Sequence, residues 1–569
     1  MSEVVFKRSE IFTISREISI DFEPFKLFKA IMQHEQKSHG MLFESARTDD
    51  QSALKSMLIT KVSLRITALK DVVTVTATTL IGQYLLSFLK NSLATELIVD
   101  EAKEAQFYFR NDKTRYPRGV LTILDPLLSL KNPEFDPFIG GLFGYDLVGE
   151  FYEVPVPEKN RERDLCLYFA EEMIVLDHKA QTATYEHLYL DAVMASRMDA
   201  YRSFNQQAEA YQVLVHRLNH ETETSLPTIS PELSTSAVTD QETVGIDKLS
   251  SSHRQASPQS YQQSYPQLEI QAPIVSAQNG VNVPDSQGFK KAVYQFIEQI
   301  NAGKLLQIVP SRAFTLPCPD PFASYQTLKE AYPSPYLFYL HDEDFTLFGA
   351  SPESALKYSP ENRELELYPI AGTKKRGMID GEIDTELDLA METTLKADKK
   401  EVSEHMMLVD LAKEDLLQIS EPDSVHVKDL MKIDRYRYVM HLVSRVAGKL
   451  KAGLSPIDAY LAVMNMGTLT GAPKVYAMEE IYRYETEARG SYGGAIGYIQ
   501  GTLYGDRFDS AIVIRSAYVK NGIAKVQAGA GIVADSIADS EVEETENKAS
   551  SVVMAILKSQ PRVSSSELA

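Results

Sequence analysis

The sequence predicts an α+β fold, and three observations lead to this prediction. The chain has 569 residues, of which 44% are hydrophobic and 24% charged, which is the composition of a globular protein with roughly two to four folded units. Patterns typical of strands and of amphipathic helices both occur along it. They do not alternate as regular βα units, which disfavours a doubly wound parallel sheet.

The N-terminal region, residues 1–220, contains strand patterns followed by a helix pattern. Residues 61–69 and 72–79 are rich in β-branched side chains and predict two paired strands. Residues 138–145 are apolar and interrupted by glycines, which predicts a strand with a close backbone neighbour. Residues 199–219 carry apolar side chains at helical spacing and predict a helix.

A change in composition separates this region from a second folded region, residues 284–560. Residues 221–283 are rich in Ser, Gln and Pro and poor in aliphatic side chains. Such a segment buries too little apolar surface to offset the entropy of ordering, so we expect a flexible linker. After it, residues 285–303 predict a helix that ends at Gly303, and residues 305–309 predict a strand.

Charge and hydropathy exclude several classes of function. The net charge of −21 argues against nucleic-acid binding, because phosphates would be repelled. No apolar run approaches the roughly 18 residues of a membrane span, and the N-terminus lacks the apolar core of a signal peptide. We therefore expect a cytoplasmic protein. The two cysteines, Cys166 and Cys318, are far apart and predict neither a disulfide framework nor a metal cluster.

Two E-x-x-E pairs are the most informative chemical feature. Glu401 and Glu404 form one pair, Glu541 and Glu544 the other, and glutamates at this spacing share one face of a helix. Residues 398–417 have a helix pattern, so a purely structural role at the start of a helix is the competing interpretation. Four carboxylates from two helices would suit a hard cation such as Mg²⁺.

Three further features point to an anionic substrate or to proton transfer. Residues 511–519 predict an apolar strand interrupted by Arg515, which would form either a salt bridge or a clamp on a substrate carboxylate. Residues 527–532 contain glycines whose backbone N–H groups could face an anion. His441 lies in a predicted strand, residues 438–444, where it is either a packed core residue or a proton carrier.

Taken together, these segments resemble the chorismate-utilising enzymes. The resemblance covers about residues 285–555 and rests on a series of motifs in order along the chain. These motifs are QIVPSR (307–312), GASPE (349–353), PIAGT (369–373), EHMMLVDL (404–411), NMGTLTGAPK (465–474), GSYGG (490–494), the Arg515 strand, the glycine turn and the helix of residues 541–548. The family resemblance implies two packed antiparallel β-sheets with helices outside and the site between them.

Two positions narrow the resemblance within this family. Ala371 stands where aminodeoxychorismate synthases of the lysine-nucleophile type carry lysine, and Gln307 stands where isochorismate and salicylate synthases carry a general-base lysine. The chain therefore resembles component I of anthranilate synthase. In that enzyme ammonia attacks chorismate, and the products are anthranilate and pyruvate; this is the first step of tryptophan biosynthesis. A 2-amino-2-deoxyisochorismate synthase, a para-aminobenzoate-type synthase and an inactive scaffold subunit are the alternatives.

The resemblance also implies a partner. The chain has no glutaminase cysteine motif, so ammonia would come from glutamine through a separate glutamine amidotransferase subunit, in a hetero-oligomer.

The resemblance further implies roles for individual residues. Glu353 would be the general acid for the departing C4 hydroxyl, His441 aided by Thr468 would transfer protons during pyruvate loss, and Lys548 would neutralise the acidic cluster. Glu404 and Glu544 would be the main Mg²⁺ ligands, supported by Glu401 and Glu541. The residues that would hold the other substrate carboxylate are Gly372, Thr373, Tyr492, Arg515, Gly529, Ala530 and Gly531.

A second site follows from the resemblance in the N-terminal region. Glu44 and Ser45 belong to a segment, LFES, that resembles the family's tryptophan feedback motif with Phe43 in place of leucine. Pro335, Tyr336 and Leu337 match the contribution of the catalytic region to the same pocket. The resemblance thus implies that tryptophan inhibits the enzyme.

Overall fold

A computed structural model of the chain describes residues 10–45, 55–109, 117–220, 281–379, 382–436 and 439–560. Most of the predicted linker, residues 221–280, lies outside the described residues. Its last three residues do not belong to a linker, because Val281–Val283 form strand β10, which pairs with β12 (Ser311–Pro317).

All pairs of neighbouring strands are antiparallel, and the strands form two layers. In spatial order, the first layer contains β10, β12, β26 (Ile523–Gly529), β25 (Ser516–Lys520), β14 (Thr346–Ser351), β13 (Tyr336–His341), β2 (Gly40–Glu44), β3 (Lys55–Leu69), β8 (Leu165–Asp177), β9 (Thr182–Leu190) and β1 (Ile11–Ile18).

The second layer also uses β3 and β8. In spatial order it contains β5 (Leu97–Asp100), β6 (Glu104–Tyr108), β4 (Val72–Ala77), β3, β8, β7 (Phe138–Phe143), β23 (Ala495–Thr502), β24 (Gly505–Ile512), β15 (Ser354–Ser359), β16 (Glu364–Leu367) and β21 (Val439–Lys449), to which β17 (Ile370–Lys375) and β20 (His426–Arg435) also pair. Two small sheets pair β11 (Gln307–Ile308) with β22 (Gly471–Ala472) and β18 (Met378–Ile379) with β19 (Glu382–Ile383).

Strands β3 and β8 join the layers because each is long enough to belong to both. The first part of β3 pairs with β2, and its last part pairs with β4. Between them the register against β8 shifts three times, from Ile59 to Leu64. Such irregularities bend a strand and let it pass from one sheet to another.

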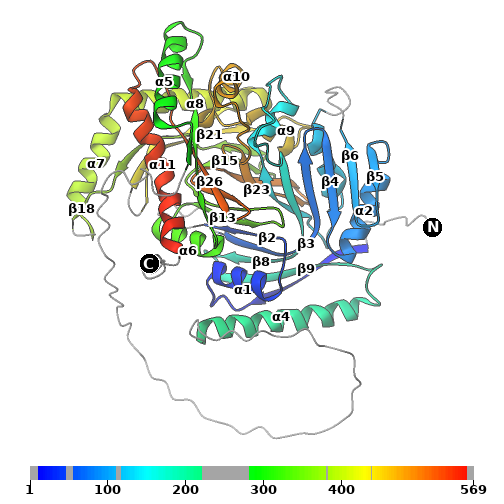
Figure 1. Cartoon of the computed structure of the whole chain (residues 1–569). Helices are drawn as coiled ribbons and strands as arrows, with labels where there is room; N and C mark the ends of the chain where they lie inside the picture. The colour runs from blue at the N-terminus through cyan, green and yellow to red at the C-terminus, as the bar shows by residue number, and fades with distance from the viewer. Residues whose placement is uncertain are drawn as a thin grey trace, which may run out of the picture.

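Of the five apolar clusters among the described residues, the three largest follow from this arrangement. A central core lies between the layers and includes Phe43, Phe338 and Leu347 from the first layer and Leu142 and Ile496 from the second. Two larger cores lie on the outer faces, under the helices that surround the sheets in Figure 1. The predicted architecture of two packed antiparallel sheets with helices outside is therefore confirmed.

The helices divide between the two outer faces and the connections near the site. Helices packed on the first layer are α1 (Pro24–His34), α4 (Arg197–His220), α6 (Pro321–Ala331) and α11 (Ala538–Ser559). Those on the second layer are α2 (Leu80–Ser92), α3 (Leu124–Leu128), α8 (Lys399–Ile419), α9 (Pro456–Val463) and α10 (Lys474–Glu485). The remaining helical segments are α5 (Ser286–Asn301), α7 (Thr385–Ala397), η2 (Gly119–Ile123), η3 (Tyr145–Glu150) and η4 (Gly467–Leu469).

Most sequence-predicted elements are present, and two predictions are wrong. The paired strands β3 and β4, strand β7 and helices α4, α5 and α8 lie where the patterns place them. The strand predicted at residues 305–309 shrinks to the two residues of β11. The strand predicted at residues 511–519 is two strands, because the backbone of Arg515 has φ +50° and breaks the extended conformation between β24 and β25.

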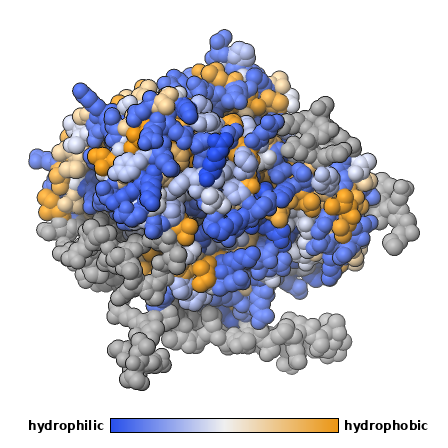
Figure 2. Space-filling view, turned by 45° about the horizontal axis from the view of Figure 1, so that its top comes forward, coloured by the Kyte–Doolittle hydropathy of each residue, from blue (hydrophilic) through white to orange (hydrophobic). Residues whose placement is uncertain are grey.

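The face shown in Figure 2 is mainly hydrophilic, with hydrophobic residues scattered over it. Within the described ranges, no helix combines the length and the apolar character needed to cross a bilayer.

Candidate active site

Glu353 lies at the centre of the candidate site, between the end of β14 and the start of β15. Its side chain is 7% exposed, and the Thr468 hydroxyl donates a hydrogen bond of 3.1 Å to its Oε1. Burial raises the pKa of Glu353 to about 8, against the opposing effects of Thr468, Lys548 and Arg515. With this pKa the carboxyl is mainly protonated at neutral pH, which is the form that can donate a proton.

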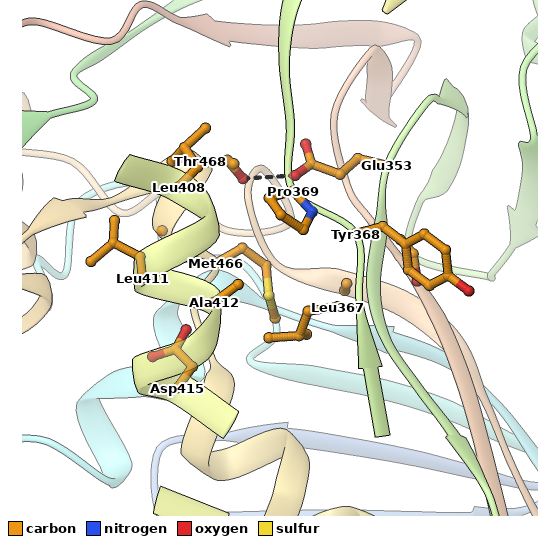
Figure 3. Close-up of a pocket in the computed structure, with 13 residues that line it drawn as sticks. Glu353, Leu367, Tyr368, Pro369, Leu408, Leu411, Ala412, Asp415, Met466 and Thr468 are labelled. Carbon is orange, nitrogen blue, oxygen red and sulfur yellow. Dashed lines mark hydrogen bonds between the residues drawn. The ribbon is translucent and has the colours of Figure 1, made fainter. Parts of the chain in front are cut away.

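A pocket opens beside this pair (Figure 3). Its walls are mostly apolar: Leu408, Leu411 and Ala412 come from α8, Leu367 and Pro369 from the opposite strand and loop, and Met466 from the loop before Thr468. Such a wall keeps water away from the carboxyl and maintains the low polarity that favours its protonated form.

His441 and Thr373 form a second polar pair on neighbouring strands, β21 and β17. Thr373 Oγ1 and His441 Nδ1 are 2.9 Å apart. Burial lowers the pKa of His441 to about 4, and the positive charge of Arg515 lowers it further. At neutral pH the His441 ring is therefore uncharged and is available as a proton acceptor. The structure also pairs Thr468 with Glu353, whereas the sequence prediction placed it with His441.

Arg515 distinguishes between the two interpretations that its strand left open. Its side chain is half-buried, and within the described residues no hydrogen bond or ion pair to its guanidinium is found. Burial lowers the pKa of Arg515, and its electrostatic neighbours include Tyr492, Glu544 and Glu353. A desolvated guanidinium without a carboxylate partner favours the binding of an external anion over a structural salt bridge.

Tyr492 and the glycine turn lie beside this arginine. Tyr492 is 4% exposed, and burial raises the pKa of its phenol to about 12. A Cβ on Gly529 would stand 2.8 Å from the Tyr492 hydroxyl, so only glycine fits there. Lys548 Nζ donates to the Gly529 carbonyl at 3.1 Å. The N–H of Ala530 already donates to Pro310 O at 3.2 Å, so its predicted role as an anion donor is wrong.

The four glutamates of the E-x-x-E pairs come from α8 and α11. Burial raises the pKa of Glu404 to about 7, and the negative charges of Glu544 and Glu401 raise it further. Burial also raises the pKa values of Glu401 and Glu541. For Glu544 burial acts in the same direction, but Lys548, which lies 2.5 Å away, lowers its pKa overall. The carboxylates of Glu404 on α8 and Glu544 on α11 are thus close enough to interact electrostatically.

The carboxylates fit a hard cation without forming a closed cage. Among the described residues, no group of three or more histidines, cysteines or carboxylates is arranged to hold a metal ion. Mg²⁺ needs less, because it commonly binds one or two protein carboxylates, several waters and an anionic substrate. The repulsion between Glu404 and Glu544 is the kind that a divalent cation relieves.

Two glycines lie close to these acids: Gly372 in β17 and Gly531 just after β26. Gly372 has φ +82°, and a Cβ there would stand 3.1 Å from Glu401 Oε2. A Cβ on Gly531 would stand 2.8 Å from Gln307 Nε2 and 3.4 Å from Glu404 Oε1. The backbone of both glycines therefore borders the acidic cluster.

The sequence patterns did not identify Arg489, a buried residue that links the backbone segments behind Tyr492. Its guanidinium is fully buried, donates to the carbonyls of Val309 at 2.7 Å and Leu469 at 2.8 Å, and pairs with Glu485 at 2.7 Å. It lies 5.5 Å from the ring centre of Tyr492. The available signal was a single arginine before a glycine-rich segment, which is too weak to identify a buried anchor.

The residues predicted to form a regulatory pocket lie together on the first layer. Strand β2 pairs with β13, and Glu44 is the direct partner of Leu337. The Glu44 carboxylate is 6% exposed and accepts hydrogen bonds from the Tyr325 hydroxyl at 2.8 Å and from Lys329 at 2.5 Å. Ser45 directly follows β2, Pro335 precedes β13 and Tyr336 is its first residue; all three are half-buried.

Comparison with known proteins adds independent findings. A family model described as chorismate binding enzyme matches residues 83–554. The chain is 41% identical over 536 residues to anthranilate synthase component 1 of Escherichia coli, covering 91% of each chain, and 38% identical over 571 residues to the protein of that name from Vibrio cholerae, covering 97% of each.

Solved structures give the same result. Anthranilate synthase component I from Streptococcus pneumoniae matches with a TM-score of 0.61 at 28% identity, covering 89% of this chain and 95% of that one. The menaquinone-specific isochorismate synthase from Escherichia coli matches with a TM-score of 0.58 at 16% identity, covering 96% of this chain and 94% of that one, and so supports the fold alone.

Proposed function

The chain belongs to the family of chorismate-binding enzymes, and from this premise we propose that it is the chorismate-converting component of an anthranilate synthase. It would convert chorismate and ammonia to anthranilate, pyruvate and water. The observation that carries the proposal is the protonated Glu353 carboxyl, which lies in a largely apolar pocket within the electrostatic range of the unpaired Arg515.

Substrate binding would use the two charged walls of the site. Arg515 would hold one carboxylate of chorismate, with Tyr492, Thr373 and the backbone N–H groups of Gly372, Gly529 and Gly531 around it. Glu404 and Glu544 would hold Mg²⁺, with Glu401 and Glu541 behind them and Lys548 limiting the negative charge. When bound, the ion supplies the positive charge that lets the second substrate carboxylate approach these acids.

In the first step, ammonia would form a bond to C2 of chorismate while the bond from C4 to its hydroxyl breaks and both ring double bonds shift by one position. The added nitrogen then releases one proton to solvent and becomes the amine. Glu353 donates its proton to the departing oxygen, so that water leaves rather than hydroxide. The burial that keeps this carboxyl protonated is therefore what makes it competent as an acid.

In the second step, the neutral His441 would remove the proton from C2 while the ether bond at C3 breaks. The three-carbon fragment takes up a proton and leaves as pyruvate, and the ring becomes aromatic. Thr373, 2.9 Å from His441 Nδ1, would hold the imidazole in the orientation for this transfer. The low pKa of His441 supports a role as acceptor rather than donor.

We also propose that ammonia comes from a glutamine amidotransferase partner and that tryptophan inhibits the enzyme. The relatives' designation as component 1 supports the existence of a partner. The pairing of β2 with β13, which places Glu44 and Ser45 beside Pro335, Tyr336 and Leu337, supports one regulatory pocket built from both regions.

A direct test combines the purified chain with chorismate, MgCl₂ and an ammonium salt at alkaline pH. The proposal predicts equal amounts of fluorescent anthranilate and of pyruvate. An amine product without pyruvate would instead identify an aminodeoxyisochorismate synthase, and no consumption of chorismate would reject the catalytic assignment. Glu353→Gln is the matched inactive control.

A further inference from the structure

We propose that Asp146 and Glu162, two carboxylates of the N-terminal region, are positioning residues that hold Tyr492 in place and so set the affinity for chorismate. The inference rests on the proposed function, in which Tyr492 contacts the substrate. It assigns part of the substrate-binding machinery to residues far from the motifs of the catalytic region.

Asp146 accepts hydrogen bonds from the backbone of the segment just before Tyr492. It lies in η3, directly after β7, and is 1% exposed. Its Oδ1 accepts hydrogen bonds from the Arg489 N–H at 3.1 Å and from the Tyr482 hydroxyl at 2.6 Å, and its Oδ2 accepts one from the Gly490 N–H at 2.6 Å. Hydrogen bonds to a charged acceptor are the stronger kind, so two successive peptide groups are fixed.

Glu162 accepts a hydrogen bond from the next backbone N–H group along the chain, that of Ser491. Its Oε2 accepts a hydrogen bond from the Ser491 N–H at 2.8 Å, and its carboxylate pairs with Lys525. A Cβ on Gly490 would stand 2.1 Å from the Glu162 carboxyl carbon, and Gly490 has φ +66°, so the close approach requires glycine. The backbone N–H groups of three consecutive residues, 489, 490 and 491, therefore donate hydrogen bonds to Asp146 and Glu162. We call these two carboxylates and the three N–H groups the clamp.

Tyr492 is the residue that this clamp presents to the site. The ring of Tyr492 lies on the Arg489 guanidinium, which also lies 4.7 Å from the ring centre of Tyr145, the neighbour of Asp146. Neither carboxylate touches the proposed substrate position, so each acts through the backbone. Because a displacement of about 1 Å at a binding group is enough to reduce activity strongly, loosening this clamp should weaken substrate binding.

A purely structural role would produce a different result. Burial raises the pKa of Asp146 to about 6, and asparagine is a neutral side chain of nearly the same size. Asp146→Asn should therefore fold. Its amide NH₂ would face one of the backbone N–H groups, so that two donors meet and one hydrogen bond of the clamp is lost. A structural contact would change the melting temperature and leave the KM for chorismate unaltered.

The test measures kcat and KM for chorismate, with ammonia and MgCl₂ saturating, in the full chain. Asp146→Asn and Glu162→Gln are compared with Asp164→Asn, which replaces an equally buried carboxylate that binds Lys70 N–H and Arg161 instead. We expect both clamp variants to raise KM about tenfold, the effect of weakening one charge-assisted hydrogen bond, with kcat within about threefold of the parent. Asp164→Asn should leave KM unchanged.

A double-mutant cycle with Tyr492→Phe identifies the route of the effect. If the clamp acts through Tyr492, Asp146→Asn should raise KM much less in the Tyr492→Phe background than in the parent. Equal effects in both backgrounds, or parental KM values in both clamp variants, would overturn the inference. Only this inference fails if the parent converts chorismate, Tyr492→Phe impairs that conversion, and the clamp variants have the same KM as Asp164→Asn. The proposed function fails if the parent itself does not act on chorismate.

Discussion

The Thr468 hydroxyl donates a 3.1 Å hydrogen bond to Oε1 of Glu353, and it is the largest of the contacts that oppose the effect of burial on this carboxyl. Burial nevertheless dominates and raises the pKa of Glu353 to about 8. The active form of a general acid is the protonated one, so activity should fall as the pH rises through this value.

Thr468→Val tests this relationship. Because the Thr468 hydrogen bond lowers the pKa of Glu353, its removal should raise that pKa and move the alkaline limb of the pH profile of kcat/KM to higher pH. The rate must be measured at a constant concentration of free ammonia. Ser354→Ala, which removes a hydroxyl at the start of β15 that donates to the Ser510 carbonyl on the neighbouring strand β24, is the control and should leave the limb in place.

Glu353→Gln should change stability in a way that depends on pH. The folded protein holds a proton on Glu353 that the unfolded chain releases, since the pKa is raised from 4.5 to about 8. Stability therefore falls as the pH rises through that window. The variant should melt at a higher temperature than the parent above pH 8 and show no such gain below pH 4.5. Glu361→Gln, at an exposed glutamate, should gain nothing at either pH.

Arg515→Gln should affect both the substrate and His441. Loss of the guanidinium removes two charge-assisted hydrogen bonds to a carboxylate, each worth about 1.5–3 kcal/mol, so the KM for chorismate should rise at least about a hundredfold. The pKa of His441 should rise from about 4, because Arg515 is one of the causes that lower it. Titration of the His441 ring by NMR checks the second effect, and an unchanged pKa would show that the two groups do not interact.

Ser45→Phe should abolish inhibition by tryptophan and leave kcat unchanged. Ser45 directly follows β2, beside the strand that carries Tyr336 and Leu337, so an aromatic ring there would occupy the proposed pocket. The measurement is the anthranilate rate against tryptophan concentration. Ser92→Phe, the same change at the exposed end of α2, should be inhibited like the parent. Equal inhibition of Ser45→Phe and the parent would exclude this pocket.

Much of the site could be predicted because its residues belong to short motifs whose chemistry is local. Glu401 and Glu404 fall on one helix face by spacing alone, and the raised pKa of Glu353 follows from placing a carboxyl in an apolar setting. The layered fold was expected from the family resemblance. The transfer of β3 and β8 between layers was not, because it depends on register shifts that leave the side-chain pattern almost unchanged.

The remaining features depend on contacts between distant segments. The apolar pattern on both sides of Arg515 reads as one strand, although a left-handed backbone at that residue divides it. The low pKa of His441 arises from burial and from Arg515, which is remote in sequence. Asp146 and Glu162 carry no motif, and their role becomes visible only when the N–H groups that they bind are seen to precede Tyr492.

The most direct test of the account is calorimetric titration of chorismate into the inactive Glu353→Gln variant, with MgCl₂ and with a chelator. Glu404 and Glu544 are expected to bind the ion that offsets their repulsion, so chorismate should bind at least about tenfold more tightly with Mg²⁺. Adding Glu404→Gln should abolish this difference, whereas Glu543→Gln, at an exposed position of α11 between Glu541 and Glu544, should preserve it. Equal affinity in MgCl₂ and in chelator would contradict the central claim that these glutamates and Arg515 form one metal-assisted chorismate site.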